Sequence, residues 1–406
     1  MSSEAKRGVG LLEGISILDL ADEKASFCTR LLADLGACVI KIEKPGGDPS
    51  RERGPFYQNR TQLGESLSFI YNNSNKYGIT LNLAHAEGRR LFLRLIKRAD
   101  VVVESFPPGY LHDLNLDFEV LSQTQPGLIL VSVTGFGQYG PRRDFKSCDL
   151  VAAAFGGQMY VAGSPSTPPL KSFEDQSYYT ASLFAAVSIL LALRKRNQRG
   201  KGEHIDISLM EAVTATLEHV MIRYFGEQII AKRQGCLHWN NAFYIFPCKD
   251  GFIHLSLFQQ WDTLIEWLES EGMVEDLKDE KWQDEAYRQK HLDHIIKVME
   301  RWTITHTRKE LFELGQLMRF PWAPVQSPNE VLESPQLRER EFFVTEKHPK
   351  LGTTLKYPRL PFKLNPQCTA PFKRAPLLGE DNAKIYRKEL GITEDEMTRL
   401  FSIKAI

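Results

Sequence analysis

Two arginines follow an apolar segment and are the first candidates for chemistry. Arg51 and Arg53 come shortly after residues 38–42, a β-branched segment typical of a buried strand. In an open α/β sheet, ligands bind at the loops that follow the strands, so both guanidinium groups are candidates for holding phosphate at the nucleotide end of a ligand. The alternative is a solvated loop whose charges bind nothing.

Two further loops follow apolar segments in the same way. Ser105, Phe106 and Gly109 come after residues 99–103, and backbone N–H groups in such a loop are candidate donors to a pyrophosphate. Gln138 lies in a Gly-Phe-Gly-Gln sequence after residues 128–133. It is either a site residue or part of a turn that the two glycines shape.

Metal and thiol chemistry have weaker support. His204, His238 and His254 have no partners at metal-ligand spacing, so core or surface roles are favoured. Cys148 stands beside Asp149 but has no histidine close in sequence, which favours a buried small residue over a reactive thiol. We therefore expect no metal site and no permanently bound cofactor.

The composition excludes some classes of protein. The 406 residues include 51 Lys+Arg and 51 Asp+Glu, so the formal net charge is zero, whereas nucleic-acid binders usually carry a basic excess. The apolar stretch 181–193 is shorter than the ~20 residues that span a bilayer, and it predicts a buried helix rather than a membrane protein. Sparse cysteines without a CxxC pair favour a reducing, cytoplasmic location.

Alternating strands and helices must position these residues. Helices are expected at 27–35 and 87–98, and strands at 15–20, 38–42, 79–83, 99–103 and 128–133. This alternation is typical of βαβ units in a parallel, doubly wound sheet. No GxGxxG follows the first strand, so the dinucleotide fingerprint is absent and the fold is expected to be Rossmann-like without NAD.

The middle of the chain changes character after a Pro- and Ser-rich loop at 164–169. The sequence predicts a helix over 177–196, a hairpin with an Asp-Gly turn between 243–246 and 252–257, and amphipathic helices at 261–268 and 293–302. A Pro-rich, basic segment from about residue 352 is expected to return over the first domain. The expected domains are a large Rossmann-like one beginning at 1–200, a small α+β domain at 225–325, and a returning segment at 330–406.

Six motifs resemble those of the family III CoA-transferases, the family of formyl-CoA transferase and carnitine CoA-transferase, to which α-methylacyl-CoA racemase is related. They occur in order along nearly the whole chain, at 31–43 (LLADLGACVIKIE), 75–83 (NKYGITLNL), 99–109 (ADVVVESFPPG), 135–141 (GFGQYGP), 200–208 (GKGEHIDIS) and 375–380 (APLLGE). No single motif is decisive, but their number and order are.

The resemblance implies an architecture and a reaction. Two chains of this family interlock, each passing through a hole in the other. A catalytic Asp attacks the thioester of an acyl-CoA to form a mixed anhydride, and the released CoA thiolate then attacks it to give an aspartyl-CoA thioester. The acceptor acid repeats the sequence. CoA is thus a substrate, whose phosphates Arg51 and Arg53 would hold and whose pantetheine or pyrophosphate would contact 105–109.

The position of the family's catalytic Asp holds a different residue here. Counted back from Gly200, that position falls at Tyr178, and the nearest carboxylate is Asp175. Asp175 is either a nucleophile on a re-spaced loop or a helix N-cap, a place where an acid is favoured.

Three other positions depart from the family. Asp113 stands where many members have an Arg that helps to hold a CoA phosphate, and an acid repels phosphate. Residues 240–242 (Asn-Asn-Ala) replace the Gly-rich loop of formyl-CoA transferase. Cys148 replaces the catalytic His of the racemase, which argues against its His/Asp acid–base chemistry.

We therefore predict a CoA-transferase-family protein that moves CoA between an acyl-CoA donor and a carboxylic acid acceptor, as a homodimer or as a heterodimer with a related chain. If the chain acts alone, Asp175 is the predicted nucleophile. The alternative is a non-catalytic structural subunit whose paralogous chain supplies the catalytic Asp, as in heteromers such as succinyl-CoA:benzylsuccinate CoA-transferase. A third interpretation is a CoA-binding or isomerase offshoot with altered chemistry.

Overall fold

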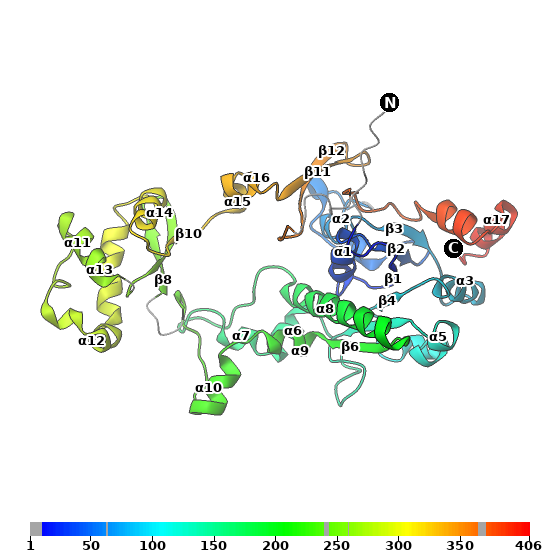
Figure 1. Cartoon of the computed structure of the whole chain (residues 1–406), viewed down its shortest axis with the longest axis horizontal. Coiled ribbons are helices and arrows are strands. Elements are labelled where there is room, and N and C mark those ends of the chain that lie inside the picture. Colours follow the sequence, from blue (N-terminus) through cyan, green and yellow to red (C-terminus); the bar gives the residue numbers. More distant parts are fainter. Residues whose placement is uncertain (1–9, 62–63, 239–242, 259, 364–370) are drawn as a thin grey trace. The chain divides into compact units, whose positions relative to one another are not determined.

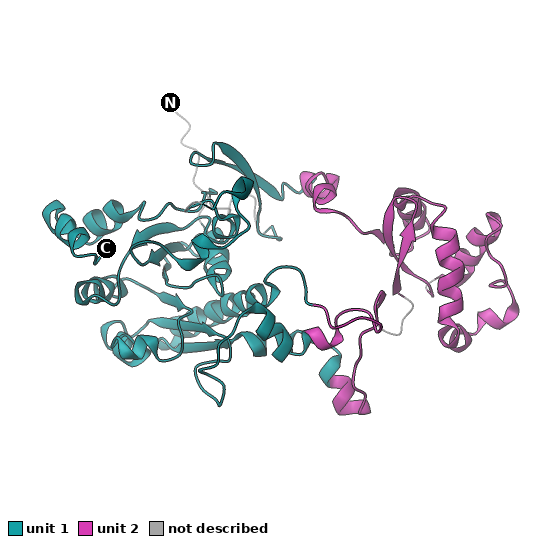
Figure 2. Cartoon of the chain, turned by 180° about the vertical axis from the view of Figure 1, so that it is seen from behind, with its two compact units in different colours: residues 1–158, 171–221, 339–406 teal, residues 159–170, 222–338 magenta. Residues whose placement is uncertain are grey.

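The computed structural model describes residues 10–61, 64–238, 243–258, 260–363 and 371–406. The chain divides into two compact units (Figure 2). Unit 1 comprises residues 1–158, 171–221 and 339–406, and unit 2 comprises residues 159–170 and 222–338. Unit 1 is therefore built from both ends of the chain.

Unit 1 is built on a six-stranded sheet (Figure 1). Its strands are β1 (Ser16–Asp19), β2 (Cys38–Glu43), β3 (Tyr77–Thr80), β4 (Val101–Glu104), β5 (Ile129–Thr134) and β6 (His204–Ser208). Every pairing is parallel, and the strand order is β3-β2-β1-β4-β5-β6. The predicted parallel, doubly wound sheet is confirmed, with β6 added at its edge. The winding direction changes between β1 and β4, the point at which such sheets bind ligands.

Helices cover both faces of this sheet. One face packs against α1 (Ser26–Asp34), α6 (Asp149–Phe155), α8 (Gln176–Arg199) and α9 (Leu209–Ala215). The other face packs against α3 (Ala86–Ile96), α5 (Phe118–Thr124), η4 (Ala383–Glu389) and α17 (Glu394–Ser402). Because successive strand residues point to opposite faces, Ile17 and Leu18 of β1 enter different cores. Strands buried on both faces explain the continuous apolar runs in the sequence.

Short elements complete unit 1. They are η1 (Pro49–Glu52), η2 (Tyr57–Asn59), α2 (Leu67–Asn72), α4 (Tyr110–Asp113) and an antiparallel hairpin of β11 (Phe343–His348) and β12 (Thr353–Pro358). The C-terminal segment lies against β3, where Asp381 accepts a hydrogen bond from the Gly78 N–H at 2.8 Å and Asn382 accepts one from the Thr80 N–H at 2.9 Å. A side chain at Gly78 would clash with Pro376, so this close approach requires glycine.

Helix α8 is longer than the sequence predicted. It continues to Arg199 and ends at Gly200, whose φ of 72° is the left-handed conformation of a glycine C-cap. Among the described residues it is the one helix long and apolar enough to cross a membrane by length and composition, and half of its apolar window is buried inside the protein. The predicted burial therefore holds for one face only, since Leu183, Val187 and Leu191 are exposed.

Unit 2 combines a small antiparallel sheet with helices. Its sheet has the order β10-β9-β8-β7, made by β7 (Leu237–His238), β8 (Phe243–Cys248), β9 (Gly251–Ser256) and β10 (Ala323–Pro324). Its helices are η3 (Glu280–Gln283), α11 (Trp261–Ser270), α12 (Glu285–Lys290), α13 (Leu292–Thr303), α14 (Arg308–Leu317) and α15 (Pro328–Leu332). Three further helices lie at or near the boundaries of the units: α7 (Gln158–Val161), α10 (Val220–Glu227) and α16 (Pro335–Glu339). The predicted hairpin is confirmed, but its two-residue turn is made by Lys249 and Asp250, because Gly251 is already paired with Cys248 as the first residue of β9.

A fully buried ion pair lies at the carboxyl end of β1. Lys76 Nζ donates to Asp19 Oδ2 at 2.8 Å, to the Asn73 side-chain oxygen at 2.8 Å and to the Ser26 carbonyl at 2.9 Å. Both side chains of the pair are 0% exposed, and burial lowers the pKa of Lys76 to about 8. Thr29 adds a hydrogen bond to the same Asp19 oxygen at 2.7 Å. The pair therefore joins β1, α1 and the segment before β3.

Replacing Asp19 by Ala should lower the free energy of unfolding by about 3–5 kcal/mol, because it leaves the buried ammonium of Lys76 without its counter-charge. Urea denaturation followed by circular dichroism measures the change. Arg90→Ala is the matched control, since Arg90 forms an exposed ion pair with Glu87 and its loss should have little effect. Equal effects of the two substitutions would contradict the role of the buried pair.

Candidate active site

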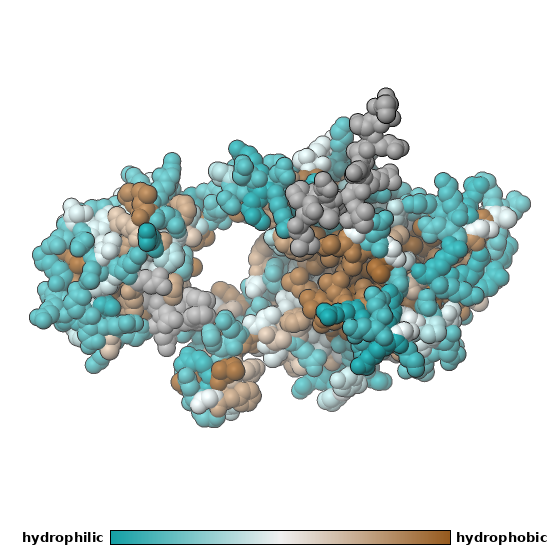
Figure 3. All heavy atoms as spheres, viewed as in Figure 1, coloured by the Kyte–Doolittle hydropathy of each residue, from teal (hydrophilic) through white to brown (hydrophobic). Residues whose placement is uncertain are grey.

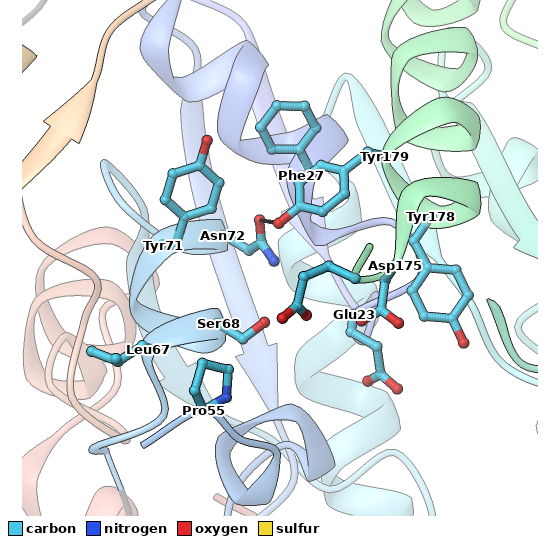
Figure 4. A pocket seen from close by; sticks show the side chains of 11 residues that line it. Glu23, Phe27, Pro55, Leu67, Ser68, Tyr71, Asn72, Asp175, Tyr178 and Tyr179 are labelled. Atoms are coloured by element: carbon cyan, nitrogen blue, oxygen red, sulfur yellow. Dashed lines mark hydrogen bonds between the residues drawn. The ribbon is translucent and has the colours of Figure 1, made fainter. Parts of the chain in front are cut away.

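Unit 1 contains a cavity of about 370 Å³ beside the loops that follow β1 and β2 (Figure 4). Four segments line it: the β1–α1 loop with the start of α1, the loop after β2, helix α2, and the start of α8. The lining residues are Glu23, Phe27, Pro55, Leu67, Ser68, Tyr71, Asn72, Glu174, Asp175, Tyr178 and Tyr179. Aromatic rings and carboxyl groups therefore dominate the walls.

Arg53 bridges two of these carboxylates. Its Nη1 donates to Glu23 Oε1 at 3.0 Å and its Nη2 to Asp175 Oδ1 at 2.9 Å. Burial opposes the charge of Arg53, but Asp175 and Glu23 outweigh it and raise the pKa of Arg53. Burial and the neighbouring Asp22 raise the pKa of Glu23. The structure thus brings Arg53 and Asp175, predicted for separate roles, into one contact at the cavity.

Asp175 occupies the N-cap position of α8, but its side chain makes no capping hydrogen bond with a described residue. The helix end is capped from elsewhere, because Asp149 Oδ1 accepts from the Ser177 N–H at 2.8 Å. In return, the Tyr178 hydroxyl accepts from the Asp149 N–H at the start of α6, at 3.0 Å. Helices α6 and α8 therefore cap each other, which leaves the Asp175 carboxylate to Arg53 and the cavity.

Tyr178, which the motif spacing predicts at the position of the catalytic Asp, makes a structural contact in this chain. The side chain is buried, and its hydroxyl is held at the end of α6. Burial and the nearby Glu23 raise the pKa of the phenol, so it stays neutral around pH 7. A neutral phenol in this place has no carboxylate chemistry to offer.

Arg51 lies away from the cavity. It is 2% exposed, and its Nε and Nη2 donate to the two carboxylate oxygens of Glu43 at 2.6 and 2.7 Å. Its guanidinium also lies 3.8 Å from the centre of the Phe69 ring. The predicted contact of Arg51 with phosphate stays a prediction, and this geometry commits the side chain to Glu43 instead.

The other predicted binding loops are also held by internal contacts. The Ser105 hydroxyl donates to Asp22 Oδ1 at 2.7 Å and accepts from the Asp22 N–H at 2.9 Å, which links this loop to the one that carries Glu23. Phe106 packs on Tyr110, with ring centres 4.6 Å apart.

Gly109 and Gln138 occupy turns whose backbone is constrained. Gly109 is the N-cap of α4, with a φ of 87°, in open space. The backbone N–H of Gln138 donates to Asp206 Oδ2 at 2.8 Å, which is the turn-shaping alternative for this residue. A contact between the Gln138 side chain and a ligand stays a prediction.

The structure also places Cys148 and Asp113, two positions at which the sequence departs from the family's pattern. Cys148 is exposed rather than buried, because it precedes α6 at the surface. Asp113 ends the short helix α4 and is exposed. No group of three or more His, Cys, Asp or Glu able to hold a metal occurs in the part of the chain that the structure describes. The loop 240–242 and the side chain of His238 lie outside the described residues.

Of the residues that line the cavity, only Asp175 and Tyr178 were singled out from the sequence. Glu23 carried a usable signal, because an acid directly after the first strand must lie at the carboxyl edge of the sheet. Tyr71 and Tyr179 carried none, since aromatic residues at helical spacing more often pack in a core. Glu174 was overlooked because its φ of 56°, a left-handed conformation that turns the chain into the helix, is invisible in sequence.

Comparisons with known proteins agree on one family. The sequence model described as CoA-transferase family III matches residues 12–382. Succinyl-CoA:(R)-benzylsuccinate CoA-transferase subunit BbsE of Thauera aromatica is 33% identical over 96% of this chain and 97% of its own length. The succinyl-CoA–L-malate CoA-transferase beta subunit of Chloroflexus aurantiacus is 32% identical over 97% and 98%. A CAIB/BAIF family structure from Brucella suis superposes with a TM-score of 0.85 at 28% identity, covering 94% of this chain and 100% of that one.

A buried carboxyl group supports the loop at 105–109. Glu104 is 3% exposed at the end of β4, and its Oε2 accepts from the Phe106 N–H at 2.7 Å. Burial raises the pKa of Glu104 to about 7, from an ordinary value near 4.5. Between about pH 4.5 and pH 7, Glu104 therefore keeps its proton in the folded protein, whereas in the unfolded chain it has lost it.

Stability should accordingly fall as the pH rises from about 4.5 to 7, and Glu104→Gln should remove this fall. The variant should gain up to about 3 kcal/mol over the natural chain at pH 8 and little at pH 4.5. Urea denaturation at several pH values tests this, with Glu13→Gln, at an exposed position, as the control. A difference between Glu104→Gln and the natural chain that does not change with pH would contradict it.

Proposed function

The chain belongs to CoA-transferase family III, and on this premise we propose that it is one subunit of a heteromeric CoA-transferase whose related chain supplies the nucleophilic Asp. The assembled enzyme moves CoA from an acyl-CoA donor to a carboxylic acid. Tyr178 carries this proposal: a buried phenol, bound to the end of α6, stands where the family's carboxylate is expected.

The charges of the cavity also favour a non-catalytic chain. Glu23, Glu174 and Asp175 line it, and Arg53 is shared between two of them. A carboxylic acid acceptor or a CoA phosphate entering this space would meet like charges in partly buried surroundings, where repulsion is weakly screened. An acidic cavity of this kind suits neither substrate of the transfer.

Relatives and surface both support a partner chain. The relatives from Thauera and Chloroflexus are named as subunits, and alpha and beta subunits of the malate enzyme both match this chain. Helix α8 exposes apolar residues at helical spacing, namely Leu183, Phe184, Val187, Leu190 and Leu191. Figure 3 shows apolar residues gathered on this side of unit 1. We propose that a related chain covers them, in the interlocked arrangement that the family resemblance implies.

The donor proposed for the assembled enzyme is succinyl-CoA. Support comes from the names of the relatives, since the benzylsuccinate, malate and mesaconate CoA-transferases all carry succinyl-CoA in theirs. The acceptor would be a carboxylic acid bound by the partner chain.

A second candidate function is catalysis by this chain alone through Asp175. It is favoured by one observation: the Asp175 carboxylate, although placed at a helix N-cap, is turned to the cavity instead of to the helix end. The contact with Arg53 would, however, occupy one of the two oxygens of this carboxylate.

Trapping of the acyl-enzyme separates these functions. The purified chain is incubated with succinyl-CoA and then with hydroxylamine or borohydride, and modified carboxyl groups are mapped by mass spectrometry. We expect no modified residue in the chain alone. With a related chain present, we expect the modification on that related chain, and transfer that is unchanged by Asp175→Asn.

Modification of Asp175 in the isolated chain, lost in Asp175→Asn, would refute the subunit proposal and establish the second candidate. Asp149→Asn is not a suitable control, because Asp149 caps α8. Asp144→Asn is suitable, since Asp144 lies on an exposed loop of the same unit.

A further inference from the structure

We propose that the cavity of unit 1 binds an organic ammonium ion. The inference is argued from the walls and charges of the cavity, and it rests on the proposed function, in which the related chain carries the nucleophile. Its volume of about 370 Å³ is within the range of small-ligand sites, and its lining is mainly apolar with a few charged groups, as in such sites.

Aromatic rings form one side of the cavity. Phe27 and Tyr179 meet edge to face with ring centres 4.8 Å apart, and Phe27 and Tyr71 are nearly parallel with centres 6.3 Å apart. Figure 4 shows Phe27, Tyr71 and Tyr179 on one side of the space and Glu23 and Asp175 toward the other. Ring faces attract cations through their quadrupole, most strongly when the cation has lost its water.

Protein cations already use rings of this cluster in that way. The Arg30 guanidinium lies 4.1 Å from the centre of the Tyr71 ring, and Arg53 lies 5.8 Å from that of Tyr178. A quaternary or alkylated ammonium group matches the same chemistry, because its bulk fills an apolar space while its charge attracts the rings. A primary ammonium or metal ion would keep too much of its water.

The charges around the cavity leave an excess of negative charge. Three carboxylates line it, those of Glu23, Glu174 and Asp175, and Arg53 offsets one. Other cations nearby are paired with other acids, in the pairs Arg30–Asp34, Lys24–Asp22 and Lys171–Asp149. The pKa values of Glu23 and of the Tyr178 phenol are both raised, first by burial and then by a neighbouring carboxylate. The second cause agrees with a negative potential at the cavity.

Three probes of similar shape test the proposal on the full chain: choline, its uncharged carbon isostere dimethylbutanol, and the anion pivalate. Isothermal titration or ligand-observed NMR measures each dissociation constant. Choline should bind at least about tenfold more tightly than the isostere, the scale of a desolvated cation–π contact. Pivalate should neither bind nor displace choline.

Two substitutions locate the site. Glu174→Gln and Glu23→Gln keep shape and remove charge, and each should weaken choline binding several-fold while leaving the weak binding of the isostere unchanged. Asp395→Asn, at an exposed position of α17, is the matched control and should have no effect. Circular dichroism verifies that each variant is folded. Because Glu174 is exposed, Glu174→Gln should fold normally, and it tests the site even if Glu23→Gln unfolds.

The proposal is overturned if choline does not bind, or if the isostere or pivalate binds as tightly as choline. It is also overturned if choline binds equally well to the natural chain and to Glu174→Gln. These results are read from the binding of probes without acyl-CoA, whereas the nucleophile is located by trapping with acyl-CoA. Failure here and failure of the subunit proposal are therefore distinguishable.

Discussion

The buried ion pair between Asp19 and Lys76 is the constraint on which the cavity depends. It lies at the point where β1 ends, and it ties that end to α1 and to the segment before β3. A second buried cation, Lys41 of β2, bonds to the carbonyl of Ala21 and to Asp48. Lys76 and Lys41 thus hold the loop between β1 and α1 from two sides, and this fixes the positions of Asp22 and Glu23. Removing one charge would strand the other in the core.

The side chain of Arg53 connects the loop after β2 to the β1–α1 loop and to the start of α8. Arg53 reaches Glu23 and Asp175 because η1 and the loop after β2 bring it to the same edge of the sheet. Helices α6 and α8 cap each other: Asp149 accepts a hydrogen bond from the N-terminus of α8, and the Tyr178 hydroxyl accepts one from the N-terminus of α6. Asp175 is consequently free to face the cavity. Electrostatics and helix capping, more than apolar packing, set the character of this site.

This chain keeps the scaffold of the family, since the family model matches residues 12–382. Close approach constrains single positions of this scaffold, as at Gly78, where a side chain would clash with Pro376. At the position where the motif spacing places the family's nucleophile, the Tyr178 hydroxyl accepts a hydrogen bond from the Asp149 N–H. The proposal of a paired subunit rests on this bond.

The sequence by itself determined the parallel sheet, the long helix before Gly200 and the hairpin of unit 2, because periodicity and turn residues are local properties of consecutive residues. The resemblance of six motifs, and not periodicity, pointed to the family, which the family model over residues 12–382 then confirmed. The sequence also singled out Tyr178 and Asp175 by their spacing. Only the tertiary structure decided that Arg51 is buried against Glu43 while Arg53 pairs with two carboxylates of the cavity. It also decided that Glu23, Tyr71 and Tyr179 line the cavity together with Asp175. Arg51 and Arg53 look alike in sequence, and only the folded chain shows that Arg51 pairs with the nearby Glu43 while Arg53 reaches the distant Asp175.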